Sequence, residues 1–141
     1  MQLDPRRQRH VPAALLAFAA AACGAPPEPD ARDLSGLLSQ AGALRGSFTP
    51  APDPPATGDN SLAMQLALVD GAPLVGAALA LEPWMPAHGH GTPTVPVVVE
   101  LGAGSYRADR IHLTMPGHWE IGIRVEWGDT ADVFILDYDA R

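Results

Sequence analysis

Apolar residues alternate with polar or small residues along much of the second half of the chain, the period expected of β-strands that bury one face. Residues 61–68 (SLAMQLAL) show this alternation and predict a half-buried strand. Asp70-Gly71 then indicates a hairpin turn, because Gly supplies the positive φ that such turns require, and residues 74–81 are predicted to return as a second strand. Residues 95–101 (VPVVVEL) predict a third strand, apolar enough to lie at the centre of a sheet.

The C-terminal hairpin can be predicted down to its register. Its first strand covers residues 119–127, and five inward side chains share one face: Trp119, Ile121, Ile123, Val125 and Trp127. Gly128-Asp129 suits a two-residue type II′ turn with Gly first. That turn creates three apolar pairs: Ile123–Phe134, Ile121–Leu136 and Trp119–Tyr138. A slip of one residue would send the paired side chains to opposite faces, so the register is strongly specified.

The turn before this hairpin is of another kind. A tight hairpin at Pro116-Gly117 would mix the apolar phase of residues 111–115 with the polar phase of the strand that follows. An arch that crosses from one sheet to another keeps both apolar faces inward. We therefore predict an all-β domain over residues 60–141, an immunoglobulin-like β-sandwich of about seven strands.

The N-terminus has the pattern of a secretory signal. Arg6, Arg7 and Arg9 precede an apolar run over residues 11–22, which at twelve residues is too short to span a bilayer of ~30 Å. Ala20-Ala21-Ala22-Cys23-Gly24 resembles the lipobox at which bacterial lipoproteins are cleaved and acylated. The resemblance implies a lipid anchor on Cys23 and a position on the periplasmic face of the cell envelope. Gly24, in place of an inner-membrane retention Asp, favours the outer membrane.

Residues 23–59 are predicted to be a tether. Seven prolines break regular structure in this segment and favour extended, semi-rigid chain. Leucines between the Pro clusters fall at helical spacing, which predicts one short helix within residues 33–45. That helix either belongs to a spacer that holds the domain away from the membrane or docks a partner.

Charge and motif content exclude several classes of function. The formal net charge is −7, and cleavage before Cys23 would remove three Arg and one Asp and take it to −9. An acidic surface repels phosphate backbones, so nucleic-acid binding is not expected. Neither a Ser-His-Asp arrangement nor a glycine-rich phosphate loop can be singled out, so we predict that the protein is not an enzyme.

Soft-metal ligand types gather in two related segments, Met85-Pro86-Ala87-His88 and Met115-Pro116-Gly117-His118. His90 follows the first segment, and Trp84 and Trp119 flank the pair. Thioether sulfur favours Cu(I) and imidazole serves many transition metals. We therefore predict a copper site from Met85, His88, His90, Met115 and His118, with Trp84 and Trp119 as aromatic caps.

Simple structural roles are the competing interpretation. Met115 shares the phase of the core residues Ile111 and Leu113, while His112 and His118 share the phase of exposed side chains. Whether the two segments meet depends on strand parity. A bulge between Tyr106 and Ile111, where the apolar phase flips, leaves two strands between them and puts both at one end of the sandwich, whereas a turn at Asp109-Arg110 makes three strands and separates them.

Four groups of residues resemble the YtkA-like domain family: Gly71-x-Pro73-Leu74, Trp84-Met85-Pro86-x-His88-Gly89-His90-Gly91, Gly104-x-Tyr106 and Met115-Pro116-Gly117-x-Trp119. The resemblance covers about residues 60–138. It implies a small immunoglobulin-like domain on exported, often lipid-anchored bacterial proteins, related to FixH-like proteins linked to copper and cytochrome oxidase assembly. The chain departs from the family pattern at His88, where Met often stands.

Two functions follow as hypotheses. The first is an envelope lipoprotein that binds or delivers copper through its Met/His loop. The second is a metal-free accessory domain that presents a sheet edge, or the loop over residues 84–92, to an unknown envelope protein.

Overall fold

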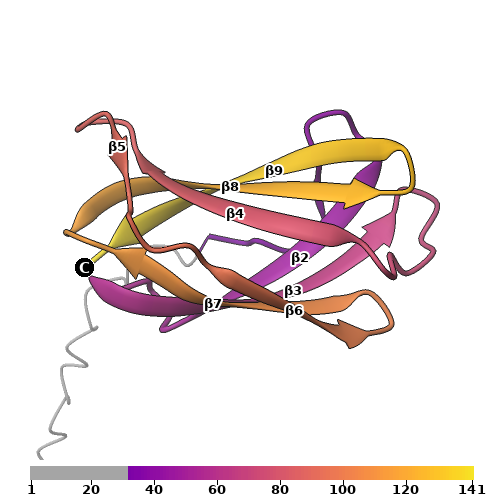
Figure 1. Cartoon of the computed structure of the whole chain (residues 1–141), viewed down its shortest axis with the longest axis horizontal. Coiled ribbons are helices and arrows are strands. Elements are labelled where there is room, and N and C mark those ends of the chain that lie inside the picture. Colours follow the sequence, from indigo (N-terminus) through magenta and orange to yellow (C-terminus); the bar gives the residue numbers. More distant parts are fainter. Residues whose placement is uncertain (1–31) are drawn as a thin grey trace, which may run out of the picture. The chain divides into compact units, whose positions relative to one another are not determined.

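The computed structural model describes residues 32–141, so the predicted signal peptide and Cys23 lie outside the described part of the chain. The described residues form two antiparallel sheets packed as two layers (Figure 1). Their strands are β1 (Leu37–Leu38), β2 (Leu44–Ala51), β3 (Gly58–Leu68), β4 (Ala78–Met85), β5 (His90–Gly91), β6 (Val97–Gly102), β7 (Ser105–Leu113), β8 (Gly117–Trp127) and β9 (Thr130–Ala140). No helix in residues 32–141 is long and apolar enough to cross a bilayer.

The strand order is that of an immunoglobulin constant-type domain. One sheet runs β1-β2-β3-β7-β6 and the other runs β5-β4-β8-β9. Without the two-residue strands β1 and β5, these become sheets of four and three strands in the order ABED and CFG. The predicted all-β sandwich of about seven strands is therefore confirmed.

The C-terminal hairpin has the predicted register. β8 pairs with β9 along its whole length, including Trp119 with Tyr138, Ile121 with Leu136 and Ile123 with Phe134. Gly128 has a φ of 53°, while Asp129 is not among the residues with positive φ, as a type II′ turn requires. Apart from the partly buried Trp127, the inward apolar side chains of both strands are buried, so this hairpin forms the centre of the core.

The predicted tether and helix are wrong for the described part of residues 23–59. Residues 44–51 form β2, which pairs with β3 from Leu44↔Leu68 to Ala51↔Ser61. Leu44 and Phe48 are buried, and Gly46 lies between them where an added Cβ would be 2.5 Å from the Phe48 ring. Pairing along eight residues and burial of this face outweigh the helical spacing of the leucines. The domain thus begins well before residue 60.

Two further strands differ from prediction. The Asp70-Gly71 turn forms, but only an isolated Ala67↔Pro73 bridge follows it, and β4 begins at Ala78 in the other sheet. β6 lies at an edge of its sheet rather than at the centre, and its outward valines are exposed. A run of valines has high β-propensity in either place, so composition alone does not separate an edge strand from a central one.

A bulge in β7 decides the strand parity. Asn60 pairs with Ile111 and Leu62 with Ala108, which leaves Asp109 and Arg110 opposite one residue, with Arg110 at a φ of 63°. Two long strands, β6 and β7, therefore separate the two Met-Pro-x-His segments. The chain then crosses between sheets after Leu113, as predicted for an arch. The β4–β5 turn and this arch lie at the same end of the sandwich, near the C-terminus (Figure 1).

Candidate functional site

The first candidate site is the β4–β5 turn, which folds the chain back at the end of β4. The Met85 carbonyl accepts hydrogen bonds from the amides of His88 (3.1 Å) and Gly89 (2.9 Å). Gly89 has a φ of 66°, a conformation that favours glycine. The chain then returns as β5, so that Met85 faces His90 directly across the strand pair. Side chains opposite each other in a sheet point to the same face, and here that face is the inner one.

The turn brings a thioether and two imidazoles together. Met85 is only 3% exposed, His90 is half-buried, and His88 is exposed. The ring centroids of His88 and His90 are 5.8 Å apart. A metal bound by one nitrogen from each ring at ~2.0–2.1 Å would separate the centroids by roughly 5–6 Å. The two imidazoles are therefore close enough to share one ion on the solvent side of Met85.

The arch between β7 and β8 packs against this turn. The Met85 methyl group lies over Gly117, where an added Cβ would be 2.8 Å from it. Trp119 is fully buried, and its indole Nε1 donates a 3.0 Å hydrogen bond to the Met115 carbonyl. This bond closes the corner before β8 in the manner of the tyrosine corner of immunoglobulin domains. The Met115 side chain is half-buried against the core.

Of the two predicted aromatic caps, the structure brings only Trp119 to the turn. The Trp119 ring meets the His90 ring edge to face at a centroid distance of 6.1 Å. Trp84 pairs with Glu120 on the outer face of the sheet and is 45% exposed. The prediction of Trp84 as a cap is wrong because adjacent residues of a strand point to opposite faces, and Met85 takes the inner one.

His118 is also absent from this group. It precedes the inward Trp119 and so lies on the outer face of β8, where its side chain is 43% exposed. Its Nδ1 is 3.2 Å from Asp139 Oδ1 and its Nε2 is 3.4 Å from Asp137 Oδ1. The predicted five-residue set is thus divided. Met85 and His90 face inward, with His88 beside His90 and Met115 against the core, whereas His118 lies on the outer face.

A second candidate site surrounds His118. One ligand atom from each of His118, Glu120 and Asp137 lies within 4.8 Å of the other two. Arg32 pairs with Asp137 (3.2 Å) and Asp139 (3.3 Å) at the border of this cluster. Glu120 and Asp137 were not among the predicted site residues, although the predicted register of this hairpin already placed them opposite each other.

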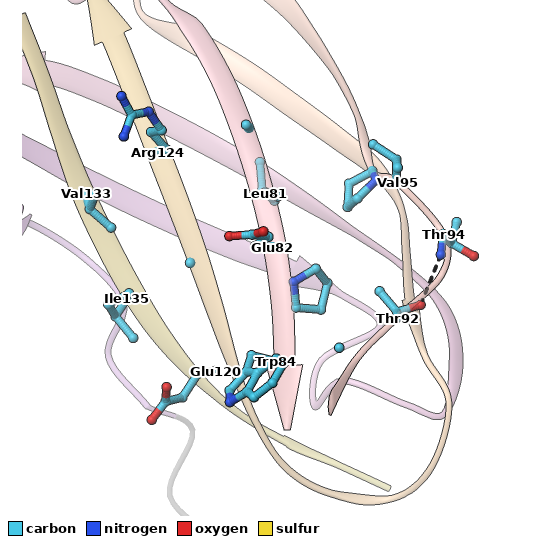
Figure 2. Close-up of a pocket in the computed structure, with 15 residues that line it drawn as sticks. Leu81, Glu82, Trp84, Thr92, Thr94, Val95, Glu120, Arg124, Val133 and Ile135 are labelled. Carbon is cyan, nitrogen blue, oxygen red and sulfur yellow. Dashed lines mark hydrogen bonds between the residues drawn. The ribbon is translucent and has the colours of Figure 1, made fainter. Parts of the chain in front are cut away.

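A groove adjoins the second site on the same outer face. Its floor is formed by β4, β8 and β9, and one wall is the segment from Thr92 to Val95 (Figure 2). Trp84 and Glu120 lie together at one end of the groove, and Arg124 lies farther along β8 (Figure 2). The floor is mostly apolar, so the cluster of His118, Glu120 and Asp137 adjoins an apolar surface.

Tyr138 lies at the same end of the sandwich, but its hydroxyl does not ionise and so offers no phenolate ligand to a metal. It pairs with Trp119, and its buried hydroxyl has no hydrogen-bond partner among residues 32–141. Burial, together with the nearby Asp53 carboxylate, raises the pKa of Tyr138 far above its usual range. The phenol therefore stays protonated at neutral pH.

Comparisons with known proteins agree with this fold. The crystal structure of a DUF4426 family protein from Pseudomonas aeruginosa PAO1 is similar, with a TM-score of 0.50 and 17% sequence identity, over 70% of this chain and 90% of that one. No curated protein sequence matches the chain. The sequence profile of the YtkA-like family matches residues 41–124, a span that includes β2, the β4–β5 turn and the arch. The chain belongs to the YtkA-like family.

Proposed function

We propose that the protein is a lipoprotein of the bacterial cell envelope that binds copper at the β4–β5 turn and passes it on. The observation that carries the proposal is the facing pair Met85–His90, with the His88 ring 5.8 Å from that of His90. In this proposal Cys23 carries the lipid, and the domain stands on the periplasmic face of the outer membrane.

The donor set suits a soft cation. A thioether and two imidazoles, with no thiol within residues 32–141, select Cu(I) over harder ions. An ion would meet the exposed His88 first and then the half-buried His90. The buried Met85 would bind it from the side of the core. Met115, in the arch at the same end of the sandwich, is a second candidate thioether ligand. A site with one open side can both receive and release its ion, as delivery requires.

A titration with Ag(I), a redox-inert substitute for Cu(I), tests the proposal on the purified full chain. One equivalent is expected to quench tryptophan emission, because the His90 ring contacts the ring of Trp119. Two variants remove ligands: H88A/H90A, and Met85→Leu, which keeps the core volume and deletes the sulfur. Each is expected to weaken binding at least tenfold.

His112→Ala is the matched control, since His112 is an exposed histidine on the other sheet. It should bind Ag(I) as tightly as the unmodified chain. Equal affinity for H88A/H90A and the unmodified chain would rule out the β4–β5 turn as the site.

A metal-free accessory role is the second candidate, and the β6 edge favours it. Four exposed apolar side chains, here called the apolar stripe, lie in β6 or just before it: Val95, Val97, Val99 and Leu101, exposed by 78%, 47%, 51% and 63%. An exposed apolar edge strand offers unpaired backbone groups to another chain. In this role β6 would receive an extended strand of a partner.

A further inference from the structure

The cluster around His118 has features that a charged surface patch alone does not require. Its three potential ligands come from two paired strands, with Glu120 directly opposite Asp137 and His118 opposite Asp139. Strands in a sheet hold side chains more rigidly than loops do. His118 and Glu120, two residues apart on β8, necessarily share one face.

The spacing between His118 and Asp137 matches that of two ligands of one ion. The 3.4 Å from His118 Nε2 to Asp137 Oδ1 is longer than the ~2.7–3.2 Å of an N–H···O hydrogen bond. Bonds of about 2.1 Å would place two ligand atoms of a tetrahedral ion about 3.4 Å apart. The half-buried Glu120 carboxylate, within 4.8 Å of both, supplies the third ligand by side-chain rotation.

Asp139 orients the imidazole for this role. Its Oδ1 lies 3.2 Å from His118 Nδ1, and in the tautomer with its proton on Nδ1 the ring would donate to this carboxylate and offer the lone pair of Nε2 to a metal. A carboxylate behind the ligating histidine is a recurrent arrangement in zinc sites. Arg32 contacts the Oδ2 atoms of Asp137 and Asp139 and leaves the Oδ1 atoms facing the ring.

We propose that His118, Glu120 and Asp137 form a binding site for a divalent cation of the zinc class, with Asp139 as the residue that positions His118. Imidazole with two carboxylates suits Zn²⁺ and Co²⁺, whereas the Met/His turn suits a soft monovalent ion. The site is on the opposite face of the sheet from Met85 and does not depend on the proposed copper function.

Titration of the purified full chain with Co²⁺, followed by displacement with Zn²⁺, tests this site. Co²⁺ in a four-coordinate N/O site has visible absorption bands, and as a paramagnetic ion it should quench the emission of Trp84, which pairs with Glu120. His118→Ala and Asp137→Asn should each weaken Zn²⁺ binding by about 10- to 100-fold. Asp139→Asn should weaken it less and keep the absorption bands.

His112→Ala is the matched control for this site too. His112 has a comparable exposure and a carboxylate partner, Asp59, at 2.7 Å, but it belongs to no described group of three such ligands. It should leave Zn²⁺ affinity unchanged. Absence of Co²⁺ absorption at millimolar metal, or equal weakening by H118A and H112A, would overturn the proposal. Because H88A/H90A should retain Zn²⁺ binding, failure of one site is distinguishable from failure of the other.

Discussion

At the scale of single residues, Asp132 is the most deeply buried carboxylate of residues 32–141. It is buried at the start of β9, where it accepts hydrogen bonds from the Ser39 hydroxyl and from the amides of Ala41 (2.9 Å), Ala43 (3.2 Å) and Val133 (2.8 Å). It thereby fixes the β1–β2 turn of one sheet against the first residues of the other. Burial acts to raise the pKa of Asp132, but these hydrogen bonds outweigh it and hold the pKa below its usual value.

Asp132→Asn should therefore destabilise the protein at neutral pH by about 1–3 kcal/mol, because amide donors that bonded a carboxylate are left poorly satisfied. A lowered pKa in the folded state means that the stabilisation is complete above the unfolded-state value of ~3.9 and is lost as pH falls through the folded-state value. The gap between the two proteins should narrow below about pH 4. Denaturant unfolding at pH 7 and pH 3 measures both effects. Asp129→Asn, in the exposed β8–β9 turn, is the control, and a gap that does not change with pH would contradict the assignment.

At the scale of elements, β6 is an edge strand with exposed apolar side chains. It pairs only with β7, and its other edge is free within the described domain. Outward positions on edge strands commonly carry charges that prevent association, but here they are Val97, Val99 and Leu101. We therefore expect another chain to bind at the apolar stripe.

Val99→Lys should change the free energy of unfolding by no more than about 0.5 kcal/mol, because the side chain is already half-exposed. It should, however, reduce concentration-dependent self-association measured by sedimentation velocity, since a charge on the edge opposes strand pairing. Val75→Lys serves as control: Val75 is 61% exposed but lies outside the strand. If all three proteins sediment alike over the concentration range, the β6 edge is not a contact surface.

At the scale of the whole molecule, the four-stranded sheet separates two kinds of chemistry. Its inner face and end carry Met85, His90 and Trp119, while its outer face carries Trp84, His118 and the acidic cluster. Trp119 is also fully buried and is hydrogen-bonded to the arch through which the chain passes from one sheet to the other. Trp84 and Trp119, two of the three tryptophans, therefore report on different sides of the same sheet.

Trp119→Phe should lower stability by about 2–4 kcal/mol, because it leaves a cavity in the core and an unpaired Met115 carbonyl. Trp84→Phe, at an exposed position, should cost less than about 1 kcal/mol. Thermal and denaturant unfolding compare the two variants, and tryptophan emission distinguishes the buried ring from the exposed one. Similar losses for both variants would contradict the central position of Trp119.

The sequence alone determined the features that depend on local alternation. In the C-terminal hairpin, one turn signal and three apolar pairs allowed a single register, because any slip would expose the core side chains. The arch was likewise predictable, since only a change of sheet kept residues 111–115 and 119–127 both facing inward. The two Met-Pro-x-His segments could be recognised as related, but not placed relative to each other.

Only the tertiary structure decided the rest, because it depended on partners distant in sequence. Residues 44–51 became β2 by pairing with β3, and the valines of β6 came to lie at an edge because β7, and no further strand of the described domain, pairs with them. The bulge at Asp109-Arg110 brought the two segments to one end of the sandwich. The alternation of side chains then put Met85 and His90 on one face and His118 on the other, so that one predicted metal site became two candidate sites of different chemistry.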